Sequence, residues 1–222
     1  ALYLQENLLT GTIPGDDSLL PMLQLSQFGA NGNALTGSLP SSLFSLPSMS
    51  LLDAADNMLT GTLPISPAST SLQFVILDGN FINGTIPDDI GRMTNLRQFF
   101  VKWNYLSGPI LEANSTLFSL KNLTAFTLRD NFFSGTMSDE MGGWDNLGVL
   151  DIAMNRFSGT LVSSLGRLTS LRAFGVDGND LSGTIPSELG LLGELSVLNL
   201  RANKLTGTIP DSFSALSRLG KQ

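Results

Sequence analysis

Apolar residues alternate with polar ones in short segments that recur along the whole chain. Each segment places apolar side chains five and three positions before an Asn, as Leu198 and Leu200 stand before Asn203. A period of two is typical of a β-strand with one buried face. The Asn returns at spacings of 23 to 27 residues, at Asn7, Asn33, Asn57, Asn80, Asn104, Asn131, Asn155, Asn179 and Asn203. This pattern predicts nine repeats whose strands stack into one continuous core.

The second half of each repeat reads L-[ST]-G-T-[IL]-P and then x-x-L-x-x-L. Leu, Gly and Ile occupy alternate positions, which predicts a second, shorter strand that ends at Pro because Pro has no N–H to donate. The following apolar residues are three apart, as in Leu165 and Leu168 or Leu189 and Leu192. That step favours a 3₁₀ or short helical turn on the opposite side of the coil.

We expect the recurring Asn to be structural. A buried side-chain amide has donors and an acceptor that can bond the backbone groups left free by a tight turn. The Asn residues from Asn33 to Asn203 are therefore assigned to the scaffold.

The repeat L-x-x-L-x-L-x-x-N-x-L-[ST]-G-T-[IL]-P resembles the leucine-rich-repeat family. Its G-x-[IL]-P half is similar to the plant-type subclass, which includes receptor-like kinase ectodomains and polygalacturonase-inhibitor-like proteins. The resemblance implies one α/β repeat solenoid over residues 1–222, with nine repeats and a partial tenth. Such a solenoid is a right-handed superhelix with a parallel concave β-sheet, short second strands and convex 3₁₀ or short helical turns.

Relatives of this kind usually carry Cys-containing caps, which are absent here. We therefore expect a fragment without its caps, in which Leu2, Leu4, Leu216 and Leu219 are partly uncovered. Three repeats also depart from the pattern. Extra residues near Gly15–Ser18 and Leu111–Thr116 predict loops, and Pro67 in place of a convex Leu predicts an irregular segment at Ile65–Ser71.

Composition excludes several classes of function. The chain has no His and no Cys, so it cannot form a Ser-His-Asp or Cys-His catalytic set, a thiolate or imidazole metal site, or a disulfide. Paired carboxylates such as Asp53 and Asp78 have no evident pocket, so we expect neither enzymatic activity nor a cofactor or metal. A net charge of −7 disfavours nucleic acid. The chain has no apolar run of 18 residues, so a membrane tether would require a segment outside it.

The outward positions of the main strands vary between repeats, and we expect them to bind a protein or peptide on the concave face. One group is apolar: Leu51, Phe74, Ile76, Phe100 and Trp103, with Phe81, Tyr105 and Phe132 on the adjacent turn. Exposed aromatic clusters mark interaction sites. The alternative is that these side chains only pack on one another within the ladder.

The second group is charged: Asp53, Asp78, Lys102, Arg129, Asp151, Asp177 and Arg201. Lys102 and Arg129 are expected one coil apart, where they could receive a carboxylate such as a peptide C-terminus. Alternatively, the nearby Asp side chains neutralise both cations, in which case the pairs contribute little.

Columns of Thr and Ser on the second strands, such as Thr136, Thr160 and Thr184, resemble the regular hydroxyl arrays of ice-binding proteins. They offer ice or a polysaccharide surface as an outlying alternative, although Thr also simply suits an exposed strand.

Three N-x-[ST] sequons at Asn83, Asn114 and Asn122 fit an extracellular glycoprotein. Our hypothesis is the extracellular ligand-binding region of a receptor-like protein or receptor-like kinase. A secreted inhibitor of a cell-wall-degrading enzyme is the leading alternative.

Overall fold

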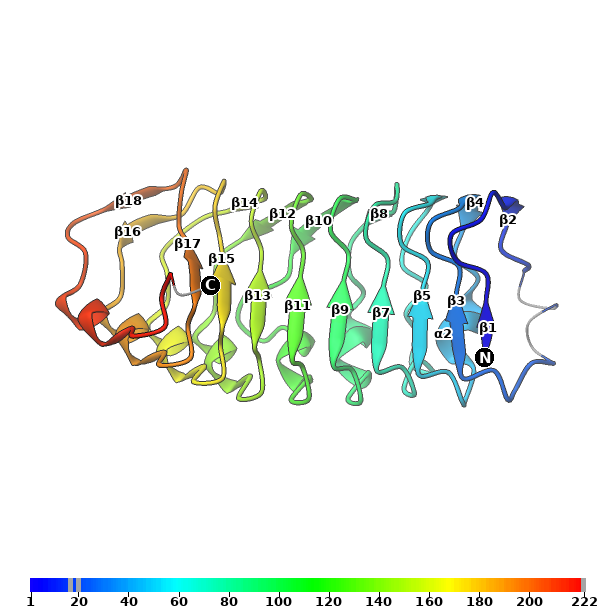
Figure 1. The fold of residues 1–222 in the computed structure, drawn as a ribbon, viewed down its shortest axis with the longest axis horizontal. Coiled ribbons are helices and arrows are strands. Elements are labelled where there is room, and N and C mark those ends of the chain that lie inside the picture. The colour runs from blue at the N-terminus through cyan, green and yellow to red at the C-terminus, as the bar shows by residue number, and fades with distance from the viewer. Residues whose placement is uncertain (16–17, 19–20, 221–222) are drawn as a thin grey trace.

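The computed structural model describes residues 1–15, 18 and 21–220, which form a row of stacked coils (Figure 1). Each coil adds one strand to a nine-stranded sheet, in which the strands follow one another in chain order and pair in parallel. The register advances by one repeat per strand, so Phe126 pairs with Phe99 on one side and Leu150 on the other. The strands are β1 (Leu2–Tyr3), β3 (Gln27–Gly29), β5 (Leu51–Asp53), β7 (Phe74–Ile76), β9 (Gln98–Phe100), β11 (Ala125–Thr127), β13 (Val149–Asp151), β15 (Ala173–Gly175) and β17 (Val197–Asn199).

The second strands run along one long edge of the solenoid, at the top of Figure 1. Among the described residues they form separate sheets of three, four and two strands rather than one continuous sheet. They are β2 (Thr10–Thr12), β4 (Ala34–Ser38), β6 (Met58–Thr60), β8 (Asn83–Gly84), β10 (Tyr105–Pro109), β12 (Phe132–Gly135), β14 (Arg156–Phe157), β16 (Ser182–Thr184) and β18 (Lys204–Thr206).

Short helical turns lie along the opposite edge, where the three-residue Leu step predicts them. They are α2 (Ser41–Ser45) and the 3₁₀ turns η1 (Asp88–Arg92), η2 (Thr116–Ser119), η3 (Asp139–Gly143), η4 (Ser163–Arg167), η5 (Ser187–Leu191) and η6 (Asp211–Ala215). Residues 65–71 contain no helix or strand, as Pro67 predicts, and residues 111–115 form a loop before η2. The expected insertion near Gly15–Ser18 includes residues 16 and 17, which lie outside the described residues. The predicted repeat solenoid is confirmed.

The two inward columns of the main strands fill the core. Phe99, Phe126 and Leu150 are fully buried, and so are the residues two positions after each of them. At the ends Leu2 and Leu4 are only half buried and Leu219 is 38% exposed, as expected. Leu216 corrects one expectation, because it is buried. It follows η6 directly and packs in the core at the convex-Leu position of the last coil.

The Asn column joins successive coils through its side-chain amides. In Asn131, Nδ2 donates to the Leu128 carbonyl of its own coil at 3.0 Å and to the Val101 carbonyl of the preceding coil at 2.8 Å. Its Oδ1 accepts the backbone N–H of Leu106 at 2.9 Å. The same three bonds recur for Asn33, Asn57, Asn80, Asn104, Asn155, Asn179 and Asn203. Each of these Asn residues therefore satisfies backbone groups in its own coil and in the preceding coil.

Asn131→Ala should lower the free energy of unfolding by about 3 kcal/mol, because it leaves buried backbone groups without a partner. Asn203→Ala should cost about 1 kcal/mol, because Asn203 is only half buried and water can replace its bonds. Urea unfolding of both variants measures the difference. Equal losses would contradict a role that depends on burial.

Candidate functional site

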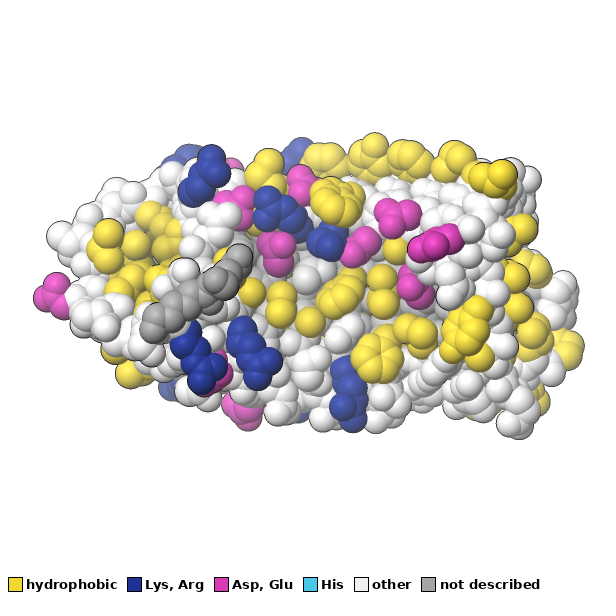
Figure 2. All heavy atoms as spheres, in the orientation of Figure 1, with side chains coloured by type: hydrophobic (Ala, Val, Ile, Leu, Met, Phe, Trp, Pro, Cys, Tyr) yellow, Lys and Arg dark blue, Asp and Glu magenta, His cyan; other side chains and the backbone are white. Residues whose placement is uncertain are grey.

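The outward positions of the nine-stranded sheet form a surface that we call the sheet face, which is turned toward the viewer in Figure 2. Cross-strand register places Asp53, Ile76, Phe100, Thr127, Asp151 and Gly175 in one row across it. A second row begins with Leu51, Phe74 and Gln98. Leu51, Phe74, Ile76 and Phe100 are half buried and lie on three adjacent strands. The structure thus brings the predicted apolar strand positions together in one band, which we call the apolar band.

The charged side chains lie next to the apolar band, and each central cation is already paired. Lys102 Nζ lies 3.2 Å from Asp78 Oδ2, and the Lys102 backbone N–H donates to the other oxygen of Asp78 at 2.7 Å. This arrangement agrees with the alternative in which neighbouring Asp side chains neutralise the cations.

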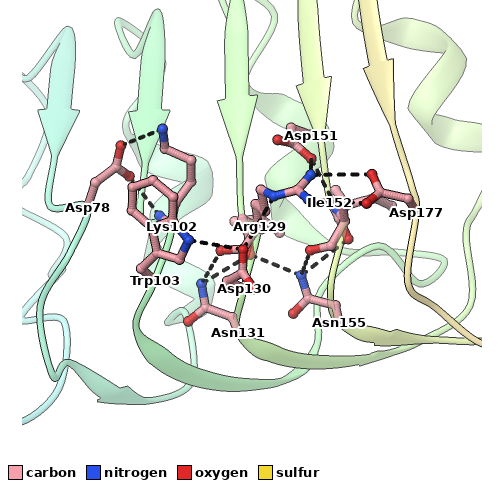
Figure 3. Close-up of polar contacts among 12 residues, drawn as sticks. Asp78, Lys102, Trp103, Arg129, Asp130, Asn131, Asp151, Ile152, Asn155 and Asp177 are labelled. Atoms are coloured by element: carbon pink, nitrogen blue, oxygen red, sulfur yellow. Dashed lines mark hydrogen bonds and ion pairs between the residues drawn. The ribbon is translucent and has the colours of Figure 1, made fainter. Parts of the chain in front are cut away.

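Arg129 is surrounded by three carboxylates (Figure 3). Its Nη1 and Nη2 donate to the two oxygens of Asp177 at 3.3 and 3.1 Å. Its Nε lies 3.3 Å from Asp130 Oδ2, and Nη1 lies 3.7 Å from Asp151 Oδ1. Asp177 is two coils away, so the guanidinium spans β13 to reach it. One positive charge therefore serves three negative ones, and this part of the sheet face is acidic.

Burial raises the pKa of three of these carboxyl groups. Desolvation is the largest cause for Asp53, Asp78 and Asp151, and hydrogen bonds from backbone N–H groups oppose it in each case. The Lys102 ammonium also opposes the rise in the pKa of Asp78, and Arg129 opposes it for Asp151. Hydrogen bonds to Asp177 raise the pKa of Arg129 above its usual range. The carboxylates thus carry a desolvation cost that their own cations offset only in part.

An aromatic row lies where the chain passes from the turn into the second strands, and two of its rings are the first residues of β10 and β12. The rings of Phe81, Tyr105 and Phe132 stack with centroids 6.0 Å apart, and the side chain of Arg156 covers the last ring at 4.8 Å. Together with Trp103, these rings line a hollow of about 630 Å³. The row is exposed and continuous over three coils. The candidate surface therefore extends from the sheet face to the start of the second strands.

Trp103 has the left-handed backbone conformation that recurs at the residue before each repeated Asn. Its φ is +52°, and the equivalent residues, which also have positive φ, are Glu6, Gly32, Asp56, Gly79, Asp130, Met154, Gly178 and Ala202. Its indole N–H donates to Asp130 Oδ2 at 3.0 Å, and Lys102 Nζ lies 5.0 Å from the ring centroid. The side chain is nevertheless 54% exposed. The left-handed conformation costs stability for any residue other than Gly, and five other coils share this cost, so the exposed indole is what distinguishes Trp103.

Other predicted residues lie apart from this cluster. Arg201 is exposed beyond β17 and forms no ion pair with the described residues. Asn83 and Asn114 are exposed, and their side-chain amides form no hydrogen bond within the described chain, whereas Asn122 Nδ2 donates to the Thr94 carbonyl at 2.8 Å. The Thr columns are exposed, but Pro109 interrupts them and their strands belong to separate sheets.

The described residues contain neither a metal-binding cluster nor a membrane-spanning helix. No group of three or more His, Cys, Asp or Glu side chains is arranged to hold a metal ion. No described helix is both long enough and apolar enough to cross a membrane.

Comparison with known proteins identifies the repeat. The Leucine Rich Repeat family model matches residues 71–93 and 194–216. The chain is a leucine-rich-repeat protein. It is 32% identical to receptor-like protein 41 of Arabidopsis thaliana over 148 residues, which cover 65% of this chain and 17% of that protein.

Solved structures of plant receptors resemble nearly the whole chain. The plant peptide hormone receptor RGFR1, solved with RGF2, superposes with a TM-score of 0.89 and 33% identity, covering 96% of this chain and 34% of that one. The ectodomain of the Arabidopsis receptor kinase HAESA, solved with an IDA peptide hormone, gives 0.88 and 31%, covering 96% and 35%. This leucine-rich-repeat protein thus resembles plant receptor ectodomains and corresponds to part of their length.

Trp103→Gly should change the free energy of unfolding by less than about 1 kcal/mol. Relief of the left-handed conformation, worth ~1–2 kcal/mol, offsets the lost indole contacts. Trp103→Ala is the matched control, because it loses the same contacts but keeps the strained backbone. Urea unfolding should show the Ala variant less stable than the Gly variant by about 1 kcal/mol, and the reverse order would disprove the strain.

Asp53→Asn should alter how stability depends on pH. A carboxyl whose pKa is raised by folding binds its proton more tightly in the folded state, so folding gains stability as pH falls from that pKa toward 3.8. The Asn variant has no such group but keeps an acceptor for Ala55 N–H. As pH falls through this range, the thermal midpoint of the wild type should rise relative to that of the variant. A parallel pH dependence of the two midpoints would contradict a raised pKa for Asp53.

Proposed function

We propose that this chain is a ligand-binding part of the extracellular region of a receptor-like protein, with a receptor-like kinase as the first candidate. The sheet face from β5 to β17 holds an extended segment of a protein or peptide. The observation that carries the proposal is the apolar band beside the charged cluster, on one continuous sheet. The core requires neither set of side chains, because both lie at outward positions.

The dimensions suit a peptide that crosses the strands. Strands β5 to β17 are seven neighbours, which at about 4.8 Å per step span roughly 29 Å. An extended peptide of about nine residues covers that length. The main strands from β3 to β15 already pair on both sides, so a ligand that lies across them must be recognised by side chains rather than by adding a strand. Trp, Tyr and Arg are the residue types that most often dominate such contacts.

The relatives support this proposal. Two ectodomains that match nearly the whole chain were solved with the peptides RGF2 and IDA. We therefore assign the partner-binding role to the apolar band, with Trp103 and Tyr105, and to the neighbouring charged side chains, including Asp53, Asp78 and Lys102. In this proposal the described coils act as one unit, since their core is continuous.

A peptide-display selection tests the proposal without a known ligand. Random twelve-residue peptides are selected on the immobilised protein, resynthesised, and titrated against the wild type by fluorescence anisotropy. Phe100→Ala should weaken the selected peptides about tenfold or more, as the loss of a central aromatic contact does.

Thr136→Ala is the control for this experiment, because Thr136 is exposed on the edge of the second strands. It should leave affinity unchanged, and both variants should keep the thermal midpoint of the wild type. Selection of no peptide, or of peptides that bind Phe100→Ala as well as the wild type, would rule out the sheet face as the binding surface.

An extracellular location makes a separate prediction about the sequons. Expressed through a secretory pathway, the protein should carry glycans at Asn83 and Asn114 but not at Asn122, whose amide is held by the Thr94 carbonyl. Intact-mass measurement of Asn83→Gln, Asn114→Gln and Asn122→Gln variants should show one glycan lost in each of the first two. Occupancy at Asn122, or an unmodified chain, would contradict this assignment.

A further inference from the structure

A small pocket opens on the sheet face over Gly175, and we call it the Gly175 pocket. Its volume is about 160 Å³, and its walls come from β13, β15 and β17 and from Arg129 and Asp177. Gly175 forms its floor because the missing side chain leaves a gap in the row between Asp151 and Asn199. A Cβ at this position would lie 2.9 Å from Asp151 Oδ1, so the carboxylate leans over the space that Gly leaves.

The pocket combines apolar walls with an excess of negative charge. Val149 and Val197 line it, and both are at least partly exposed to solvent. Asp151 and Asp177 contribute two carboxylates against the single guanidinium of Arg129, which also contacts Asp130. Asp151 Oδ1 accepts the Ala153 N–H at 3.1 Å, and its Oδ2 accepts no hydrogen bond from the described residues.

A neighbouring hydroxyl also lacks a partner. Thr127 is 7% exposed, and its Oγ1 forms no hydrogen bond within the described chain. It pairs in register with Asp151 and lies on the sheet face, because its neighbour Phe126 points into the core. A buried hydroxyl without a partner costs free energy, but Thr127 lies beside the Gly175 pocket and not in its lining.

We propose that the Gly175 pocket receives one lysine or arginine side chain of the peptide bound on the sheet face. This inference rests on the proposed function, since it names the chemistry of the same ligand. The aliphatic stem lies against Val149 and Val197, and the cationic head reaches the free oxygen of Asp151. A carboxylate ligand is disfavoured, because Arg129 is already held by Asp177 and the pocket carries surplus negative charge.

The test uses peptides selected by display on the wild-type protein. Each Lys is replaced by norleucine, which keeps the aliphatic stem, and each Arg by citrulline, which keeps the length of the side chain; both replacements remove the charge. Dissociation constants are then measured on the wild type and on two pocket variants, Gly175→Val and Asp151→Asn. Gly175→Val fills the pocket with a residue that suits a strand, and Asp151→Asn removes the charge of the proposed acceptor without removing volume.

Two control variants match these changes. Gly29→Val alters the equivalent position of β3, where the atoms nearest to a new Cβ belong to Tyr3 and Gln5 rather than to a carboxylate, although Asp53 pairs in register from β5. Asp180→Asn removes an exposed carboxylate that pairs with Lys204 outside the pocket. Thermal unfolding of all variants identifies any that lose their fold.

The selected peptides should share a basic residue whose neutralisation weakens binding to the wild type about tenfold or more. Neutralisation should have little further effect on Gly175→Val and Asp151→Asn, and the full effect on Gly29→Val and Asp180→Asn. Selected peptides without a basic residue, or an equal effect of neutralisation on every variant, would overturn this inference. If those same peptides still require Phe100, the proposed function stands; if no peptide binds, both proposals fall.

Discussion

The fold depends on one hydrogen-bonding unit, the side-chain amide of the repeated Asn. Each chain turn that leaves a main strand exposes backbone N–H and C=O groups close to the core, where water cannot satisfy them. Asn131 satisfies such groups in its own coil and in the preceding one, and the other Asn residues of the column do the same. Because the bonds run between coils, the unit works only when coils are stacked. The Asn column and the apolar columns therefore stabilise the same assembly, and neither would be satisfied in an isolated repeat.

Folding does not constrain the side chains of the sheet face. The core uses the inward positions of each coil and the turn uses the Asn, which leaves the outward positions free to vary. Some of these side chains even oppose folding, since Asp53, Asp78 and Asp151 are carboxyl groups whose pKa is raised by burial. Arg129 offsets part of this cost at Asp151, but its single charge is shared with Asp130 and Asp177. An acidic surface beside an apolar band is the result, and a ligand that brings both apolar and cationic groups would complement it.

The sequence predicts the features that recur in every repeat, but it does not predict contacts between side chains of different repeats. The inward columns, the Asn column and the irregular segment around Pro67 follow from spacing alone, because each depends on a position within one coil. The pairing of Arg129 with Asp177 does not, since the two residues are 48 positions apart and separated by β13. The Gly175 pocket is equally hidden, because it arises from the way Asp151 leans over a missing side chain. Leu216 is buried although it stands near the end of the described chain, because η6 continues the column of helical turns.

Several costs that folding does not require lie on the sheet face and the turn beside it. The turn position before the Asn has a left-handed backbone in coil after coil, held by Gly at Gly32, Gly79 and Gly178 and by other residue types in the remaining coils. In the coil between β9 and β10 this position carries Trp103, which is largely exposed and directly follows Lys102 in the chain. The raised carboxyl pKa values and the unpaired hydroxyl of Thr127 lie on the same five strands, β5 to β13. Gly and neutral side chains would fit the coil at each of these places. In the proposed function, these departures from the most stable scaffold lie on the surface that binds the ligand.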